Sequence, residues 1–153
     1  MDIEKLKALI DSDAASATRT PQQIADWCNA RVMAAPVPSA AVAQYLVAAG
    51  LMAEIVLASR ESVAADGLNR PKIKAALDMV TAIETLPSFD LSVPAYLARI
   101  TAALDALITH GFITETHKAQ ILALGDNKRT RAEAAGLGEV WGLHVAAAGR
   151  GVL

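Results

Sequence analysis

The segment from Ser92 to Gly138 limits the possible folds more than any other part of this sequence, because three helix starts and three helix stops follow one another in it. Each start is a residue whose hydroxyl group can cap a helix N-terminus: Ser92, Thr114 and Thr130. Each stop is a glycine, which readily takes the left-handed conformation that ends helices: Gly111, Gly125 and Gly136. The segment therefore predicts an antiparallel helical hairpin followed by a short helix.

Two further helices are predicted at the N-terminal end. Asp2 is placed to cap the first helix. Thr20 is placed to cap the second, with Pro21 at the first helical position and Gln23 where it completes a capping box. Cys28 falls on the apolar face of this second helix, so we interpret the single cysteine as a packing residue and not as a reactive thiol.

The central part of the chain starts after a proline-containing linker, residues 34–38, which cannot continue a helix. Ser39 is placed to cap a long apolar helix in which Gly50 introduces a kink or a division. Pro71 marks the start of the next helix, whose apolar residues keep helical spacing to Leu86.

The apolar run over residues 40–58 is long enough to cross a bilayer. Gln44 and Glu54 lie inside it, and a charged residue near the centre of a span costs about 2.5–3.5 kcal/mol. We therefore expect no membrane span. The run belongs either to the core or to an interface, and the sequence leaves both open.

Composition favours a single all-α domain over residues 1–153, because 54% of the residues are hydrophobic and only 4% are aromatic. Alanine, leucine, valine and isoleucine in these proportions suit closely packed helices. We predict a compact bundle of about five to seven helices that ends in the antiparallel hairpin plus a short C-terminal helix. Its parts are an N-terminal helical pair (1–35), central helices (39–86) and the C-terminal hairpin with short helices (92–148).

No arrangement of residues predicts catalysis. The three histidines are His110, His117 and His144. They are not spaced as ligands on one helical face, and the chain has no paired cysteines that could complete a tetrahedral zinc site. The glycines at 136 and 138 are too close together for a phosphate-binding loop and are better explained as helix termination. We therefore expect no enzyme, no cofactor and no metal.

Charge does not select a partner either, because the formal net charge is only −2. The one local basic cluster, residues 128–131, lacks interleaved aromatic residues and lies between Asp126 and Glu133. We expect no specific binding of nucleic acid.

The run LDALITHGFITETHKAQILALGDNKRTRAEAAGLGEVWGLHVAAA, residues 104–148, resembles the end of a group of small alanine-rich proteins of tailed bacteriophages and prophages. Their shared pattern is an "LxALxxxGxIT…K..ILAL" hairpin, then "SRAEELGLG" and "V…GHV..A". The RAEELGLG-like motif corresponds here to residues 131–138. The pieces IADWCNA and VPSAAVAQYLVAAGL are also similar, and Leu143 departs from the pattern by standing between the glycine and the histidine.

This resemblance implies a non-enzymatic virion structural or assembly protein of the tail or neck, made in the host cytoplasm and located in the virion. Its partners would be other phage structural proteins, with the chain present in multiple copies. The alternative is a soluble helical phage protein that binds and modulates a host protein. Val140, Trp141 and Leu143 are the candidate partner-interface residues, because an exposed apolar surface there could dock onto a larger assembly. A core role for Trp141 is an equal alternative, given its size.

Overall fold

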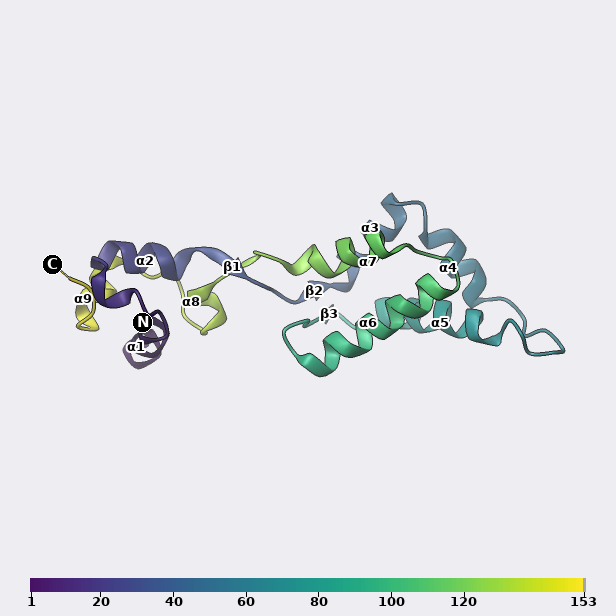
Figure 1. The fold of residues 1–153 in the computed structure, drawn as a ribbon, viewed down its shortest axis with the longest axis horizontal. Coiled ribbons are helices and arrows are strands. Elements are labelled where there is room, and N and C mark those ends of the chain that lie inside the picture. The colour runs from purple at the N-terminus through teal and green to yellow at the C-terminus, as the bar shows by residue number, and fades with distance from the viewer. Residues whose placement is uncertain (153) are drawn as a thin grey trace. The chain divides into compact units, whose positions relative to one another are not determined.

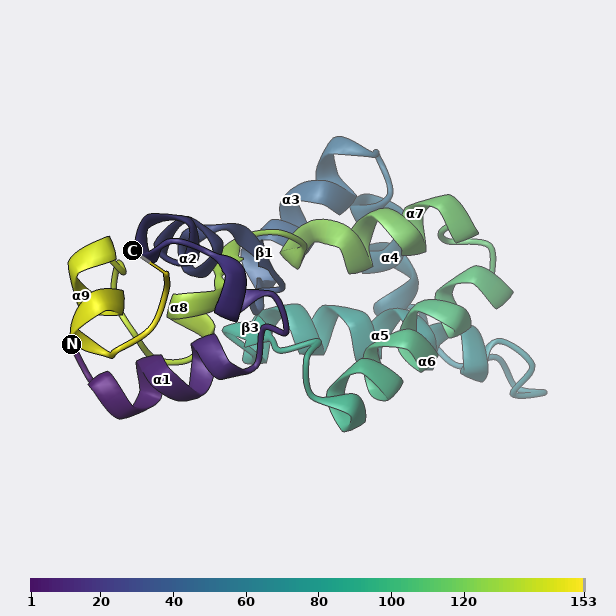
Figure 2. The same ribbon diagram turned by 60° about the vertical axis from the view of Figure 1, so that its left-hand side comes forward.

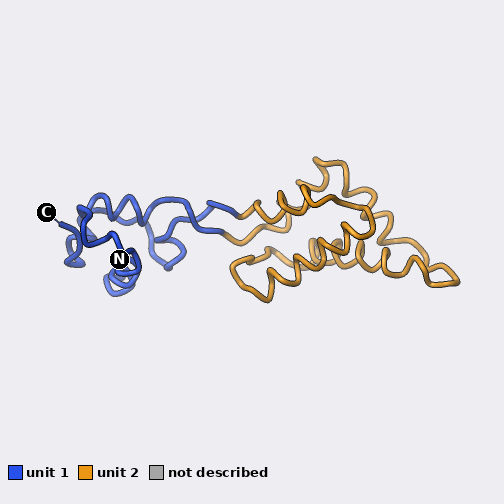
Figure 3. The backbone as a smooth tube through the Cα atoms, in the orientation of Figure 1, with its two compact units in different colours: residues 1–34, 126–153 blue, residues 35–125 orange. Residues whose placement is uncertain are grey.

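The computed structural model describes residues 1–152. Helices contain 61% of the chain and strands 6%, so the prediction of a mostly helical protein is confirmed. The residues of the chain divide into two compact units, which are coloured separately in Figure 3. Unit 1 contains residues 1–34 and 126–153, and unit 2 contains residues 35–125.

Unit 2 contains five α-helices, one 3₁₀ turn and a two-stranded sheet: β2 (Val37–Pro38), α3 (Ser39–Ala48), α4 (Met52–Ser59), α5 (Arg70–Thr85), β3 (Ser88–Phe89), α6 (Pro94–Thr109), α7 (Glu115–Leu122) and η2 (Ala123–Gly125). Helix α5 packs against α3, α4 and α6. The chain reverses direction between α6 and α7, which gives the predicted hairpin (Figure 1). Gly111 ends α6 with a φ of 76°, and Thr114 caps α7 by accepting a hydrogen bond from the backbone N–H of His117.

One core fills unit 2. Its fully buried large side chains come from four different elements: Val37, Leu46, Ile55, Leu104 and Leu107. Gly125 lets two segments of this unit approach closely, because a Cβ atom there would lie 2.4 Å from the carbonyl oxygen of Ala35. The backbone N–H of Ala35 donates to the carbonyl of Gly125 over 2.9 Å.

Unit 1 is built from both ends of the chain: α1 (Ile3–Asp11), η1 (Ser16–Thr18), α2 (Pro21–Asn29), β1 (Arg31–Met33), β4 (Arg129–Thr130), α8 (Arg131–Ala134) and α9 (Gly142–Ala147). Helix α9 packs mainly on α2, as Figure 2 shows for the yellow and dark purple helices. The guanidinium of Arg150 forms two hydrogen bonds of 2.7 Å with the carboxylate of Asp11. The unit has its own core of small and aliphatic side chains: Leu6, Ile10, Ile24, Ala25, Cys28, Ala132, Leu137, Val140, Val145 and Ala148.

The expectation of a strictly all-α protein was wrong, because the described residues include two small antiparallel sheets. Strand β2 pairs with β3, and β1 pairs with β4 across an irregularity in register. Pro36, Pro38 and Pro87 favour extended backbone in two segments, of which the sequence indicated the first, residues 34–38, only as a linker. The two extended segments pair with each other. Nine α-helices occur in residues 1–152, more than expected, because Gly50 divides the central run and α8 and α9 are very short.

Two predicted caps are also corrected. Ser39 is the first residue of α3 and not its cap, and its buried hydroxyl donates to the carbonyl oxygen of Leu86. Ser92 does not cap α6, which follows Val93, because the Ser92 hydroxyl and backbone N–H both donate to Asp90. Asp2, Thr20 and Thr130 cap their helices as predicted.

No single helix in residues 1–152 has the length and apolar character to cross a membrane. Helices α3 and α4 reach that length and composition only together, and the chain bends by 108° between them. Within the 40–58 run, Leu46 and Ile55 are buried in the core of unit 2, whereas Val47 and Leu57 are exposed.

Length and composition predicted one domain, whereas the structure has two units, each with a separate core. The assignment of residues 1–153 to a single domain stays a prediction.

Candidate functional site

The three residues predicted as a partner interface lie at the start of α9, and their side chains have different surroundings. Val140 is 1% exposed and belongs to the core of unit 1, so its side chain is not an interface group. Trp141 is 54% exposed and Leu143 is 69% exposed. Of the three predicted interface residues, Trp141 and Leu143 therefore lie on the surface, and the side chain of Val140 lies in the core.

Asn29, the last residue of α2, fixes the backbone that leads into this surface. Its Nδ2 donates to the carbonyl oxygen of Val140 over 2.7 Å, and its Oδ1 accepts from the backbone N–H of Val140 over 3.0 Å. One side-chain amide thus satisfies both backbone groups of a buried residue. Sequence reasoning missed Asn29, because a single asparagine at the end of a helix gives no signal of a distant partner.

The start of α9 is held in a second way, through His144. The backbone N–H of Trp141 donates to His144 Nδ1 over 3.1 Å, and the backbone N–H of His144 donates to the carbonyl oxygen of Trp141 over 2.9 Å. Gly142 lets this turn approach α2, since a Cβ atom there would lie 3.1 Å from Gln22 Oε1. These contacts order the backbone that carries the Trp141 and Leu143 side chains.

The exposed residues of this short helix are all apolar. Leu143, Ala146 and Ala147 share one face by their spacing of three and four positions, and Trp141 precedes them at the helix start. We call Trp141, Leu143, Ala146 and Ala147 the α9 surface. An exposed tryptophan on ordered backbone is the kind of residue that carries binding energy at protein interfaces.

The neighbouring polar groups of unit 1 have structural roles. The Arg131 guanidinium lies 4.4 Å from the centre of the Trp27 ring and donates to the carbonyl oxygen of Trp27 over 2.9 Å. Glu133 completes the capping box of α8 with Thr130. Arg131, a member of the basic cluster, thus contacts the end of α2, and Glu133 stabilises the start of α8.

Cys28 is fully buried in the core of unit 1. Burial raises the pKa of its thiol to about 11; the charge of Arg131 lowers this pKa by less, and the charge of Asp13 raises it slightly. A thiol with this pKa is almost entirely protonated at neutral pH and is a poor nucleophile.

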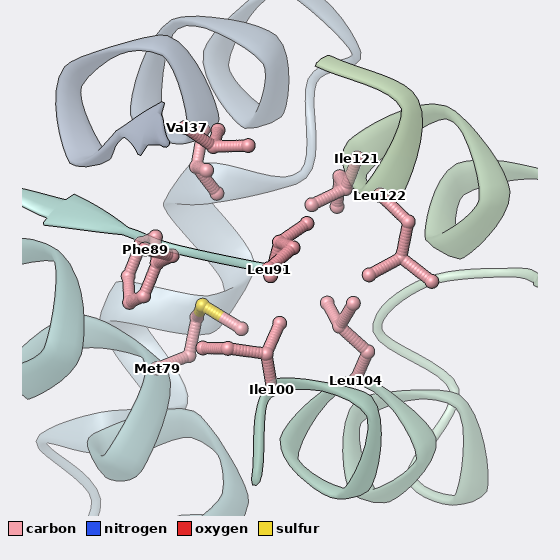
Figure 4. Close-up of a pocket in the computed structure, with 9 residues that line it drawn as sticks. Val37, Met79, Phe89, Leu91, Ile100, Leu104, Ile121 and Leu122 are labelled. Carbon is pink, nitrogen blue, oxygen red and sulfur yellow. The ribbon is translucent and has the colours of Figure 1, made fainter. Parts of the chain in front are cut away.

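Unit 2 contains a void of about 10 Å³ in its core, and Figure 4 shows the side chains around it. The lining is apolar and includes Met79, Leu91, Leu104 and Ile121. A space of this size is close to the smallest that holds one water molecule, and an apolar lining offers water no hydrogen bonds. We interpret the void as a packing gap.

Within residues 1–152, no three side chains of histidine, cysteine, aspartate or glutamate lie together as a metal site would require. The α9 surface is exposed and apolar, and it contains two of the three residues predicted as a partner interface, Trp141 and Leu143. Comparisons of the chain with protein-family models, with curated proteins and with solved structures find no match.

Proposed function

We propose that this chain is a non-enzymatic structural or assembly protein of a tailed bacteriophage, that it is located in the tail or neck of the virion, and that it docks onto other virion proteins through the α9 surface. The observation that carries the docking part is the exposure of Trp141 and Leu143 on a helix start that Asn29 and His144 hold in place. The phage part rests on the resemblance of residues 104–148 to small phage proteins.

The α9 surface offers enough apolar area for binding when copies act together. Full burial of a large apolar side chain contributes about 1.5–3 kcal/mol, and Trp141 and Leu143 are each more than half exposed. One such contact gives a weak complex. Several copies of the chain on a repeating partner would bind far more tightly, because after the first contact each further contact forms within the same assembly.

Mass spectrometry of purified virions tests the phage part of the proposal. We expect peptides of this chain in virions at a ratio to the major structural proteins that stays constant through purification. Absence of the chain from virions in which the major structural proteins are detected would overturn the virion assignment. A stoichiometric host protein recovered with the chain from infected cells would then support the alternative, a modulator of a host protein.

Complementation with surface variants tests the α9 surface. Trp141→Ala and Leu143→Ala should lower the amount of chain in virions while leaving its unfolding transition within about 0.5 kcal/mol of wild type. Leu57→Ala is the matched control, because Leu57 is 68% exposed and lies in unit 2. Equal incorporation of all three variants would show that the α9 surface is not the docking site.

A further inference from the structure

Unit 2 has a second surface with the features of a peptide-binding groove, and it lies beside strand β3. A hollow of about 270 Å³ lies between the strand and the first turns of α6. Phe89 and Ile100 contribute apolar lining, and Leu86, Tyr96 and Arg99 also line the hollow. We call this hollow, together with Ser88, the β3 groove.

The backbone of Ser88 faces outward along the edge of the sheet. In an antiparallel pair, residues alternate between those that exchange hydrogen bonds with the partner strand and those whose N–H and C=O point away from it. The backbone N–H of Ser39 donates to Pro87, which makes Ser39 and Pro87 a hydrogen-bonded pair. Ser88, opposite Pro38, is the next position in the ladder, so its N–H and C=O point away from β2. The sheet has two strands, and this edge of β3 therefore offers one donor and one acceptor to an added strand.

The side chains of α6 give this edge a chemical preference. Tyr96, Arg99 and Ile100 share one face of the helix, at the spacing of three and four positions. Tyr96 is 53% exposed and Arg99 is also exposed. The carboxylate of Asp90, which also lines the hollow, accepts hydrogen bonds from the backbone N–H and the hydroxyl group of Ser92. Arg99 lines the same hollow as Phe89 and Ile100 and supplies a cation there.

We propose that the β3 groove binds an extended peptide segment of a partner protein, in which an aspartate or glutamate lies next to apolar residues. The segment adds to the sheet as a strand by pairing with the backbone of Ser88. An apolar side chain of the segment packs on Phe89 and Ile100, and the acidic side chain pairs with Arg99. This surface belongs to unit 2 and is independent of the α9 surface, so the chain would have two docking surfaces for different partners.

A synthetic probe peptide of alternating valine and threonine with a central glutamate tests the proposal by NMR titration of the isotope-labelled full chain. We expect amide shifts at Ser88, Phe89 and Tyr96. Arg99→Glu should weaken binding of the probe roughly fivefold, the size expected for loss of an exposed ion pair. Arg60→Glu is the matched control, because Arg60 is exposed at the end of α4 in the same unit, and it should leave the affinity unchanged.

Two altered probes separate the parts of the argument. A probe with a central lysine should bind Arg99→Glu better than it binds wild type, because the charges are exchanged. A probe methylated on alternate backbone nitrogens should lose binding, because it cannot complete the strand. Shifts that avoid Ser88, equal binding of the methylated probe, or equal loss in Arg99→Glu and Arg60→Glu would each overturn the proposal. Trp141→Ala should bind the probe as wild type does, so the result does not depend on the function of the α9 surface.

Discussion

Asn29 and Val140 are 111 positions apart in the sequence, and two hydrogen bonds of 2.7 Å and 3.0 Å join the side-chain amide of the first to the backbone of the second. An amide side chain donates from its nitrogen and accepts at its oxygen without carrying charge. The pair joins the segment before α9 to the end of α2.

Asn29→Ala should destabilise the protein by about 1–3 kcal/mol, because it leaves the N–H and C=O of a buried residue without partners. Asn29→Asp should fall between wild type and Asn29→Ala, since a carboxylate accepts from the Val140 N–H but cannot donate to its carbonyl. Urea unfolding measures both. Asp26→Ala, an exposed position on the same helix, is the control and should change the unfolding free energy by less than about 0.5 kcal/mol. An unfolding curve of Asn29→Ala that matches this control would contradict the role of the pair.

Gly125→Ala should destabilise unit 2 by about 1–3 kcal/mol. The new Cβ atom would lie 2.4 Å from the carbonyl oxygen of Ala35 and 3.0 Å from Val37 Cγ2, so the backbone has to move. Gly138→Ala is the matched control, because a Cβ atom there meets nothing within 4 Å. Thermal unfolding of the two variants measures the difference, and equal melting temperatures would show that the approach of the two segments in unit 2 is not tight.

Acidification should remove the contribution of Glu133 to stability. The pKa of Glu133 lies below its ordinary value of 4.5, first because the backbone N–H of Thr130 donates to its carboxylate, and also because Arg31 and Arg129 are near. A carboxyl group with a lower pKa in the folded chain adds stability above its unfolded pKa and loses it as the pH falls through the folded pKa. Glu133→Gln keeps a capping side chain but does not titrate. Its unfolding free energy should therefore approach that of wild type as the pH falls from neutral to about 3, and parallel curves would contradict the capping role.

Cys28 should react slowly with iodoacetamide in the folded protein and fast in urea. The thiol is fully buried, and its pKa of about 11 keeps it protonated at neutral pH. Asn29→Ala should speed the reaction, because it destabilises the unit that buries Cys28. A native rate equal to the rate in urea would show that this core opens freely.

The sequence predicted those parts of the fold that depend on a few neighbouring residues. The capping box of Thr20 and Gln23 and the cap provided by Thr130 form as expected, since each needs only residues three positions apart. Gly111 and Gly136 have the positive φ expected of residues that end helices. The predicted caps failed where a hydroxyl group had a better acceptor elsewhere: Ser39 bonds to Leu86, which lies 47 positions away.

The rest of the fold depends on contacts between distant segments, which local patterns do not report. The pairing of Val37 with Phe89 makes a strand of a segment that reads as a linker. Val140 and Trp141 are adjacent in a segment without helical spacing, so no period indicated that one is buried and the other exposed. The sequence also did not indicate Ser88 and Arg99 as site residues. They line one hollow only because α6 packs beside the edge of a sheet.

The division of unit 1 between the two ends of the chain has a consequence for biosynthesis. Residues 35–125 leave the ribosome as one continuous stretch and contain the whole core of unit 2. Residues 1–34 come first but cannot complete their core until Ala132, Val140 and Val145 have been made. Residues 1–34 are therefore synthesised before unit 2 but are buried only after it is complete, and their apolar groups, Cys28 among them, stay open to chaperones until residues 132–148 have been made.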